Sequence, residues 1–398
     1  MAKNINTSGS KIGLVLSGGG ARTAYQVGVL KAVAEFLPPE ISDPFPIICG
    51  TSAGAINALA IAGCHGSENQ RTFQSRIKKI ESIWCELEAS NIYRSDLFGV
   101  LKNTLTMFFS IFNKGSTKKN PKALLDNTPL RGLLRELVDF EAINESIDSK
   151  RITAVSVTAV SYSDGKSVTF YDGEEALQPW VRSRRIGIRS KLTIDHIMAS
   201  TAIPVMFPTI KIMGSYFGDG AIQQLKPISP ALHLGANKIF IIGINDNASN
   251  KSPLLSDAAN PHTHNPPSSA KIIGHILNSA FIDAIESDLE TLKNINRLAE
   301  ILPAETREAE GIGDLQPIKF LMISPSESIG ALARNYFKEL PLSMRFFFKI
   351  MGITTRSEGI EIASYVMFSK GFCSKLVELG YQDGLAKQQA IIEFLLKE

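Results

Sequence analysis

Short apolar runs separated by helical patterns constrain the fold of this 398-residue chain more than any other feature. Buried parallel strands have this apolar composition, and helices connect them across the faces of the sheet. We therefore predict an α/β fold with a mainly parallel sheet covered on both faces. The expected strands are Ile12 to Leu16, Pro46 to Cys49, Ile152 to Val160, Lys238 to Ile244 and Ile318 to Ile323, and the expected helices include Ala21 to Phe36, Ala53 to Gly63, Arg71 to Leu87 and Leu130 to Phe140.

The composition of the chain changes after residue 245. Residues 246–269 are rich in Pro, Asn and Ser, which is typical of a long surface loop or a linker. A long helical pattern, Ala270 to Leu302, follows, and then one strand-like run and three helical segments. We predict a core that carries the chemistry at 1–245 and a mostly helical section at 270–398. Whether the strand of that section joins the same sheet is left open.

Charge and cysteine content argue against several classes of protein. The 42 basic and 39 acidic residues are mixed along the chain, so no overall field favours nucleic acid. The four cysteines form no CxxC pair, which indicates buried thiols in a reducing compartment rather than a metal site. The N-terminus lacks the apolar run of a signal peptide, and no stretch reaches the ~18 apolar residues of a spanning helix. We expect a cytoplasmic protein, peripheral to a membrane at most; export without an N-terminal signal is left open.

A G-x-S-x-G pentapeptide, Gly50-Thr51-Ser52-Ala53-Gly54, lies between a strand-like run and a helical pattern. In a nucleophile elbow the serine occupies a strained strand-to-helix turn, and the flanking glycines leave room for neighbouring backbone. The N-terminus of the following helix would favour negative charge near Ser52. Alternatively, Ser52 only caps this helix, and the small residues let the helix pack closely on the sheet. The pentapeptide alone does not decide between the two.

An attacking serine needs a proton acceptor within hydrogen-bond reach. The six histidines carry no flanking signature: His65, His196, His233, His262, His264 and His275. Asp219 is a better candidate, because "KIMGSYFGDGAI" predicts a hairpin that turns at Gly214-Ser215 and places glycines on both sides of this aspartate. The alternative is a solvated Asp-Gly turn. A carboxylate near its ordinary pKa of ~3.9 is a weak base, so a dyad requires a partly desolvated site.

Four motifs follow one another along the chain: "SGGGAR" after the first expected strand, "GTSAG" about thirty residues later, "STAIPVMFP" at Ser200 to Pro208, and "DGA" at Asp219. In this order and spacing they closely resemble the patatin-like phospholipases, which are serine hydrolases with a Ser-Asp dyad. The resemblance extends over about Lys11 to Ile244. It implies a three-layer α/β/α patatin-like fold, here with extra C-terminal helices, and a phospholipid or lysophospholipid substrate.

The resemblance also implies a role for each matching residue. Ser52 matches the nucleophile that forms an acyl-enzyme, and Asp219 matches the base of the dyad. Backbone N–H groups of the glycine-rich loop match the oxyanion hole. No cofactor and no metal is implied. The remaining matches are Gly18, Gly19, Gly20, Ala21 and Arg22 in the loop, Gly50 and Gly54 in the elbow, and Gly220 and Ala221 in the DGA motif.

Two residues of the glycine-rich loop stand out. Thr23 occupies the position where the family commonly has a further glycine, so we expect an altered acyl pocket rather than a loss of activity. Arg22 places a cation in the first turn of a helix, against the helix dipole. An anionic partner is therefore expected, either a lipid head group or a structural carboxylate, unless the side chain simply points to water.

Functions other than lipid hydrolysis remain open on the sequence. An acyltransferase or thioesterase would use the same dyad and pass the acyl group to another acceptor. A dinucleotide-binding module would use the glycine loop, although its G-x-G-x-x-G fingerprint has Thr23 at the sixth position and leaves Ser52 and Asp219 unexplained. A membrane-associated scaffold without activity conflicts with no motif.

Two segments are unusually apolar and aromatic, 98–112 and 336–353. Each is interpreted either as a buried helix or as a patch that enters lipid. In the second interpretation, aromatic side chains of the first segment enter the bilayer and nearby lysines meet anionic head groups. The residues concerned are Phe108, Phe109, Phe112, Lys114, Lys118 and Lys119.

Overall fold

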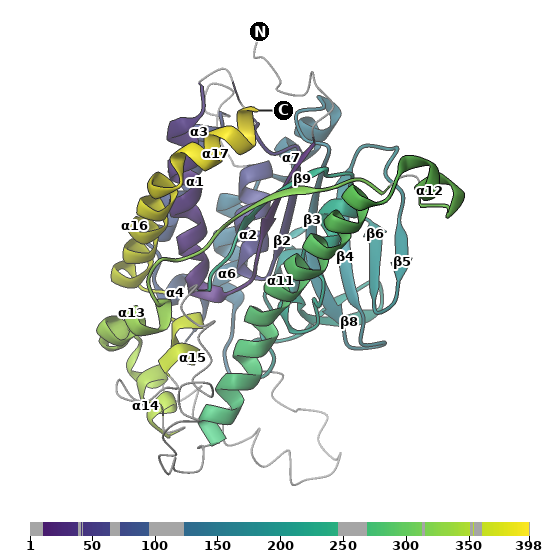
Figure 1. Ribbon diagram of the computed structural model, residues 1–398. Coiled ribbons are helices and arrows are strands. Elements are labelled where there is room, and N and C mark those ends of the chain that lie inside the picture. The colour runs from purple at the N-terminus through teal and green to yellow at the C-terminus, as the bar shows by residue number, and fades with distance from the viewer. Residues whose placement is uncertain are drawn as a thin grey trace, which may run out of the picture.

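The computed structural model describes residues 11–38, 41, 43–63, 72–94, 123–245, 269–312, 315–350, 353 and 360–397; within these ranges the side chains of 269–283 and 304 are not described. The described chain forms one mixed sheet between two layers of helices (Figure 1). The predicted α/β fold with a mainly parallel central sheet and C-terminal helices is confirmed. The loop expected at 246–269, except for its last residue, and the apolar segment 98–112 lie outside the described residues.

The ten strands of the sheet are arranged in the order β10-β9-β1-β2-β3-β4-β6-β5, and β8 pairs with β3 and β7 beside this path. Neighbours from β10 to β3 are parallel, as expected for strands joined through helices. Strand β4 then runs antiparallel to β3. The strands are β1 (Ile12–Leu16), β2 (Ile47–Thr51), β3 (Ala154–Ser161), β4 (Ser167–Gly173), β5 (Trp180–Arg182), β6 (Arg185–Arg189), β7 (Ile210–Ile212), β8 (Ser215–Asp219), β9 (Lys238–Ile242) and β10 (Lys319–Ile323).

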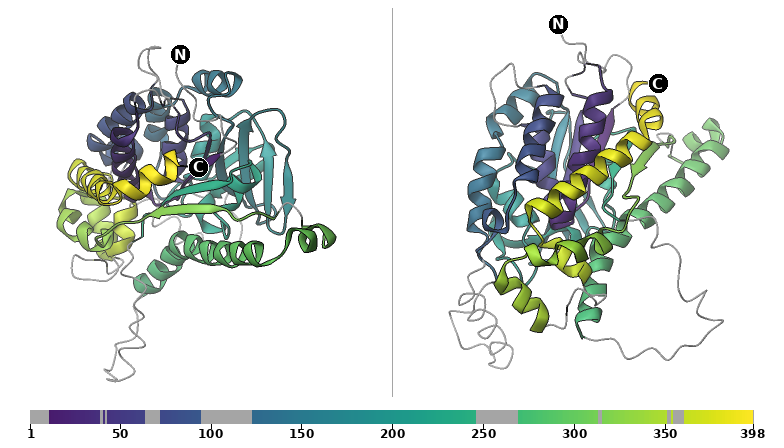
Figure 2. Two further views of the ribbon diagram at one scale, coloured as in Figure 1. Left: turned by 45° about the horizontal axis from the view of Figure 1, so that its top comes forward. Right: turned by 90° about the vertical axis from the view of Figure 1, so that its left-hand side faces the viewer.

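Helices cover both faces of the sheet, as the two views in Figure 2 show. Because side chains alternate along a strand, Leu14 and Leu16 join one apolar core while Val15 joins the other. The first core includes α1 (Ala24–Phe36), α2 (Ala53–Ala62), α3 (Phe73–Cys85) and α16 (Lys370–Ala386), and the second includes α9 (Ser229–His233) and α11 (Ser269–Ile301). The other helices are α4 (Ala89–Ile92), α6 (Thr128–Leu137), α7 (Phe140–Asp148), α8 (Ile194–Ser200), α12 (Ala304–Ala309), α13 (Ile329–Tyr336), α14 (Leu342–Ile350), α15 (Ile360–Tyr365) and α17 (Gln388–Leu396).

Several expected boundaries differ from the structure, and two of the differences have a clear physical reason. The helix predicted from Leu130 to Phe140 is α6, which ends at Leu137. The Asp139 side chain accepts hydrogen bonds from the backbone of Glu141 and Ala142 and so caps the next helix, α7, which begins at Phe140. The predicted hairpin exists between β7 and β8, but it turns at Met213-Gly214 rather than one residue later. Both turn residues have positive φ, 49° and 85°, as a two-residue turn of type I′ requires.

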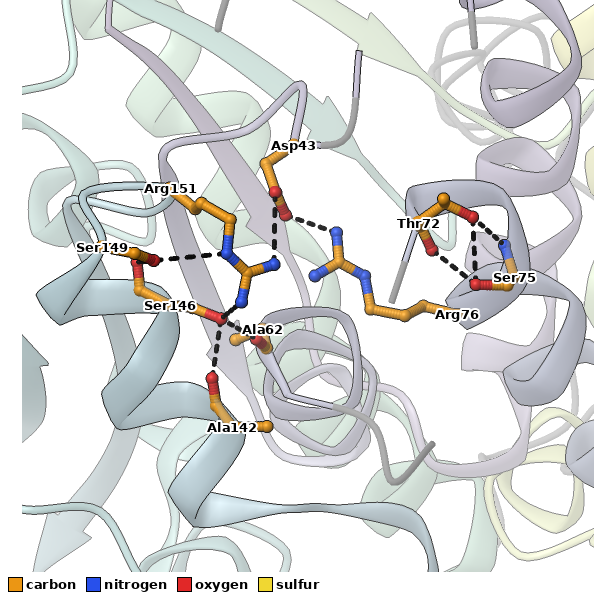
Figure 3. A network of polar contacts seen from close by, with 9 residues as sticks. All are labelled: Asp43, Ala62, Thr72, Ser75, Arg76, Ala142, Ser146, Ser149 and Arg151. Carbon is orange, nitrogen blue, oxygen red and sulfur yellow. Dashed lines mark hydrogen bonds and ion pairs between the residues drawn. The ribbon is translucent and has the colours of Figure 1, made fainter. Parts of the chain in front are cut away.

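A buried ionic cluster joins three elements at the amino-terminal end of β2 (Figure 3). The Asp43 carboxylate accepts a hydrogen bond from Arg76 on α3 and lies 3.6 Å from an Nη atom of Arg151. Arg151 in turn donates to Ser146 on α7 at 2.6 Å. The cluster therefore fixes the outer helices at the end of the sheet opposite to Ser52, which follows β2.

Candidate active site

Ser52 occupies the turn between β2 and α2, with φ 54° and ψ −131°. A non-glycine residue in such a conformation is strained by about 1–3 kcal/mol, as is common for residues at functional sites. A Cβ atom on Gly54 would come within 2.4 Å of the Leu16 carbonyl oxygen, and one on Gly50 would come within 2.6 Å of the Gly54 oxygen. Both glycines are thus required by the close approach of backbone. The Ser52 hydroxyl caps no backbone N–H of α2, which contradicts the simple capping alternative.

The hydroxyl of Ser52 donates a hydrogen bond to Asp219 instead. The distance from Ser52 Oγ to Asp219 Oδ2 is 2.6 Å, and both residues are buried. Asp219 ends β8, and its Oδ1 accepts a hydrogen bond from the Ala221 N–H at 2.9 Å. Burial raises the pKa of Asp219 to about 7, although the hydrogen bonds from Ser52 and Ala221 act in the opposite direction. Such a carboxylate is a far better base at neutral pH than an exposed one.

The glycine-rich loop after β1 lies directly against Ser52. A Cβ atom on Gly18 would come within 2.8 Å of the Ser52 Cβ, so a side chain at this position would displace the serine. The Arg22 N–H already donates to the Gly19 oxygen at 3.1 Å. The Arg22 N–H is therefore a weaker candidate donor to an oxyanion than the backbone N–H groups that precede it, from Gly18 to Ala21.

The side chains of Arg22 and Thr23 both make hydrogen bonds within the protein. Arg22 is buried; its Nε donates to the Ser364 hydroxyl at 2.6 Å, its Nη2 donates to the Glu361 carbonyl oxygen at 2.9 Å, and its guanidinium carbon lies 4.1 Å from the Tyr365 ring centre. The guanidinium thus binds α15, not a lipid head group. Thr23 has φ −70°, which needs no glycine, and its hydroxyl donates to the Gly20 oxygen.

Several residues that support the dyad were not identified from the sequence. The Ser52 N–H donates to Ser200 Oγ at 2.8 Å, and the Ser200 hydroxyl donates to the Thr158 oxygen at 2.6 Å. The Asp219 N–H donates to the Ala202 oxygen at 3.0 Å. Because Ser200 and Ala202 belong to the "STAIPVMFP" motif, that motif holds both members of the dyad. The motif was visible in the sequence, but its contacts with Ser52 and Asp219 depend on tertiary structure and could not be predicted.

A second set of polar side chains holds the glycine-rich loop to the elbow helix. Asn57 on α2 donates to the Thr23 oxygen at 3.2 Å and to the Gln26 side chain at 3.0 Å, and it accepts from the Trp84 indole at 2.8 Å. Gln26 in turn donates to the Ser17 oxygen at 2.9 Å. All these partners are buried, so the relative position of loop and elbow is well defined.

The described histidines serve other contacts. His196 packs edge-on against Phe170, and His233 stacks on Trp180. Burial lowers the pKa of both to about 4. Among the residues that the structure describes, no group of three His, Cys, Asp or Glu side chains is placed to hold a metal ion. In that same part of the chain, no helix combines the length and apolar character needed to cross a bilayer.

Comparison with known proteins places this geometry in context. The sequence matches the family model described as "patatin-like phospholipase" over residues 14–232. It is 29% identical over 222 residues to the "cGAMP-activated phospholipase" of Pseudomonas aeruginosa, and the match covers 55% of each protein. The chain therefore spans about half the length of the curated relative it matches. The solved structure of VipD from Legionella pneumophila aligns with a TM-score of 0.32 and 15% identity, over 96% of this chain and 67% of that one, a likeness too weak to support an inference.

Proposed function

The chain belongs to the patatin-like phospholipase family, and we propose on this basis that it is a serine lipid acyl hydrolase that cleaves carboxylic ester bonds of phospholipids or lysophospholipids. The observation that carries the proposal is the buried hydrogen bond of 2.6 Å between Ser52 and Asp219. The relative from P. aeruginosa is named as activated by cGAMP; only hydrolysis is proposed for this chain.

In the proposed reaction, Asp219 takes the proton of Ser52 as the serine oxygen attacks the ester carbonyl carbon. The carbonyl oxygen becomes an oxyanion that faces the N–H groups between Gly18 and Ala21. When the tetrahedral intermediate collapses, the C–O bond of the ester breaks and Asp219 returns the proton to the leaving alcohol. The carboxylate then takes a proton from water, whose oxygen attacks the acyl carbon of the acyl-enzyme. When this second intermediate collapses, the bond between the acyl carbon and Ser52 Oγ breaks, Asp219 returns the proton to Oγ, and the fatty acid is released.

Three features of the site support these steps. Burial of Asp219 raises its pKa to about 7, so that it both accepts and returns a proton near neutral pH. Ser52 has a strained φ of 54° and its hydroxyl points to Asp219, and the N-terminus of α2 adds favourable charge next to the oxyanion. The alternative functions use the same dyad: an acyltransferase passes the acyl group to an acceptor other than water, and a thioesterase cleaves a thioester instead of an oxygen ester.

We also propose that the enzyme works as a peripheral protein at a bilayer surface. The residues first expected to enter lipid, Phe108, Phe109 and Phe112, lie outside the described part of the chain. The second apolar segment supports the proposal. On α14, Leu342, Phe346 and Ile350 follow at four-residue spacing and are 74%, 51% and 65% exposed, so they form one apolar row along the helix.

Mass spectrometry of the products tests the function. Wild type, Ser52→Ala and Ser149→Ala are incubated with a mixed panel of phospholipids and lysophospholipids; Ser149 is an exposed control serine. Wild type and the control should release free fatty acid and become labelled by a fluorophosphonate, whereas Ser52→Ala should do neither. Retained hydrolysis by Ser52→Ala contradicts the proposal, and acyl transfer to an added alcohol or thiol without free fatty acid supports the alternative.

A further inference from the structure

A basic cavity lies at the same end of the sheet as the dyad. Its volume is about 260 Å³, slightly below the ~300–1,000 Å³ of typical small-molecule pockets. Polar groups that line it come from the start of β4, the turn between β5 and β6, and the segment after the DGA motif: Ser167, Ser183, Arg184, Arg185, Gln224 and Lys226. The described residues that line the cavity include no carboxylate.

Gln224 connects this cavity to the nucleophile. It lines the cavity, and its side-chain oxygen accepts a hydrogen bond of 2.6 Å from Thr51, the residue before Ser52. Its amide nitrogen donates to Thr158 at 3.3 Å. Thr51 pairs with Thr158 across β2 and β3, and β4, which carries Ser167, is the next strand. Two strand spacings, about 10 Å, therefore separate the β2 backbone from the β4 backbone.

The positive charge of the cavity is only partly balanced. Lys226 lies 3.2 Å from Asp288 on α11 and donates to Thr291, so its ammonium group has partners. Arg185 Nε is buried without a hydrogen-bond partner in the described structure. The positive charge also affects a neighbouring histidine. Burial lowers the pKa of His233, and the charges of Arg182 and Arg185 lower it further. A guanidinium N–H that is buried without an acceptor costs free energy.

We infer that the basic cavity binds a phosphate group. Guanidinium groups, hydroxyls and an ammonium group are all donors, and arginine matches the oxygen geometry of phosphate. The volume suits a polar head group, not a diacyl lipid. Because a glycerophospholipid carries its phosphate and its ester groups on one glycerol, we take a lipid head group as the source of this phosphate. The identification of a lipid head group as the source of the phosphate rests on the proposed function. A soluble ligand that carries a phosphate group would supply the same chemistry.

Binding and turnover are measured separately. In the inactive Ser52→Ala background, calorimetry with glycerol 3-phosphate and with inorganic phosphate should give binding that a further Arg185→Gln substitution weakens at least tenfold. With active protein, kcat/KM is compared on a lysophosphatidic acid and on the monoacylglycerol of the same acyl chain. Arg185→Gln should lower kcat/KM on the lysophosphatidic acid at least tenfold more than kcat/KM on the monoacylglycerol. Arg184→Gln should also lower kcat/KM on the lysophosphatidic acid. The control is Lys211→Gln, an exposed lysine outside the cavity, which should leave both values unchanged.

The results distinguish a lipid head group from a soluble ligand, and they can also reject the inference that the cavity binds phosphate. Loss of substrate preference together with competitive inhibition by glycerol 3-phosphate identifies a lipid head group. Loss of phosphate binding without a change in preference identifies a soluble ligand. The inference is wrong if neither phosphate compound binds the Ser52→Ala protein, or if both bind equally well after Arg185→Gln. Turnover that survives Ser52→Ala contradicts the proposed function alone, since the binding measurement needs no turnover.

Discussion

Asp219 illustrates how burial alters the chemistry of one residue. Its carboxylate has no histidine between it and the serine, so it must itself be basic enough to take the proton. Desolvation provides this property, because it disfavours the charged form and raises the pKa to about 7. The hydrogen bonds from Ser52 and Ala221 keep the ionised form accessible. The balance of these effects sets the pH range in which the proposed dyad works.

Activity and stability should depend on Asp219 in opposite ways. We expect kcat/KM of wild type to rise with pH through an apparent pKa near 7, and Asp219→Asn to lower it by about 10²–10⁴-fold. Because the folded pKa lies above the unfolded value of 3.8, wild type loses stability as pH rises from about 4 to about 7. Asp219→Asn lacks this loss, and its stability relative to wild type should increase by ~2–4 kcal/mol over that range.

Urea unfolding at several pH values, alongside the pH profile of the rate, checks this prediction. The control is Asp148→Asn, since Asp148 is exposed at the end of α7. A difference in stability between Asp219→Asn and wild type that stays constant with pH would show that Asp219 titrates alike in the folded and unfolded chain, and a flat rate profile would exclude it as the base.

Elements whose pattern is local could be predicted, and those that depend on distant partners could not. The apolar runs at β1, β2 and β9 gave strands because parallel strands are buried on both faces. Strands β5 and β6 have exposed positions, so no apolar run marked them, whereas β7 was expected only as one arm of the predicted hairpin. The dyad residues were inferred from glycine-flanked motifs. Arg22 was expected to face an anion, because nothing local indicates that α15 packs over it.

Helix α14 gives a test of membrane contact at the level of one element. We expect Leu342→Ser, Phe346→Ser and Ile350→Ser together to lower binding to vesicles of phosphatidylglycerol and phosphatidylethanolamine about tenfold or more. Each exposed apolar side chain loses part of the ~1.5–3 kcal/mol that full burial provides. Co-sedimentation with the vesicles measures binding, and hydrolysis of a water-soluble short-chain ester shows whether the site itself is intact.

The matched control for α14 lies on α11. Leu298 and Ile301 are 55% and 65% exposed, and Figure 1 places this end of α11 far from α14. Leu298→Ser with Ile301→Ser should leave vesicle binding unchanged. Equal losses in the two variants would mean that exposed apolar area in general, and not the α14 row, governs binding.

At the scale of the whole molecule, the C-terminal helices are built into the fold of the N-terminal half. Strand β10 extends the sheet next to β9, and α16 packs along α1 (Figure 2). The Tyr25 hydroxyl on α1 donates to Asp383 on α16 at 2.9 Å. Helix α1 follows the glycine-rich loop, and α15 binds Arg22 in that loop. The position of the loop thus depends on residues more than three hundred positions away in sequence.

Close backbone contact between α1 and α16 should make the two halves unfold together. A Cβ atom on Gly380 would come within 2.1 Å of the Tyr25 carbonyl oxygen, so Gly380→Ala forces the helices apart. We expect a destabilisation of about 1–3 kcal/mol, as for other overpacked cores.

In contrast, Gly132→Ala on α6 meets no atom within 4 Å and should stabilise the chain by about 0.5–1 kcal/mol through helix propensity. Thermal unfolding followed by circular dichroism and by residual ester hydrolysis measures both effects. A single transition that Gly380→Ala shifts equally in the two measurements is expected; two separate transitions would instead show that 270–398 unfolds as an independent domain.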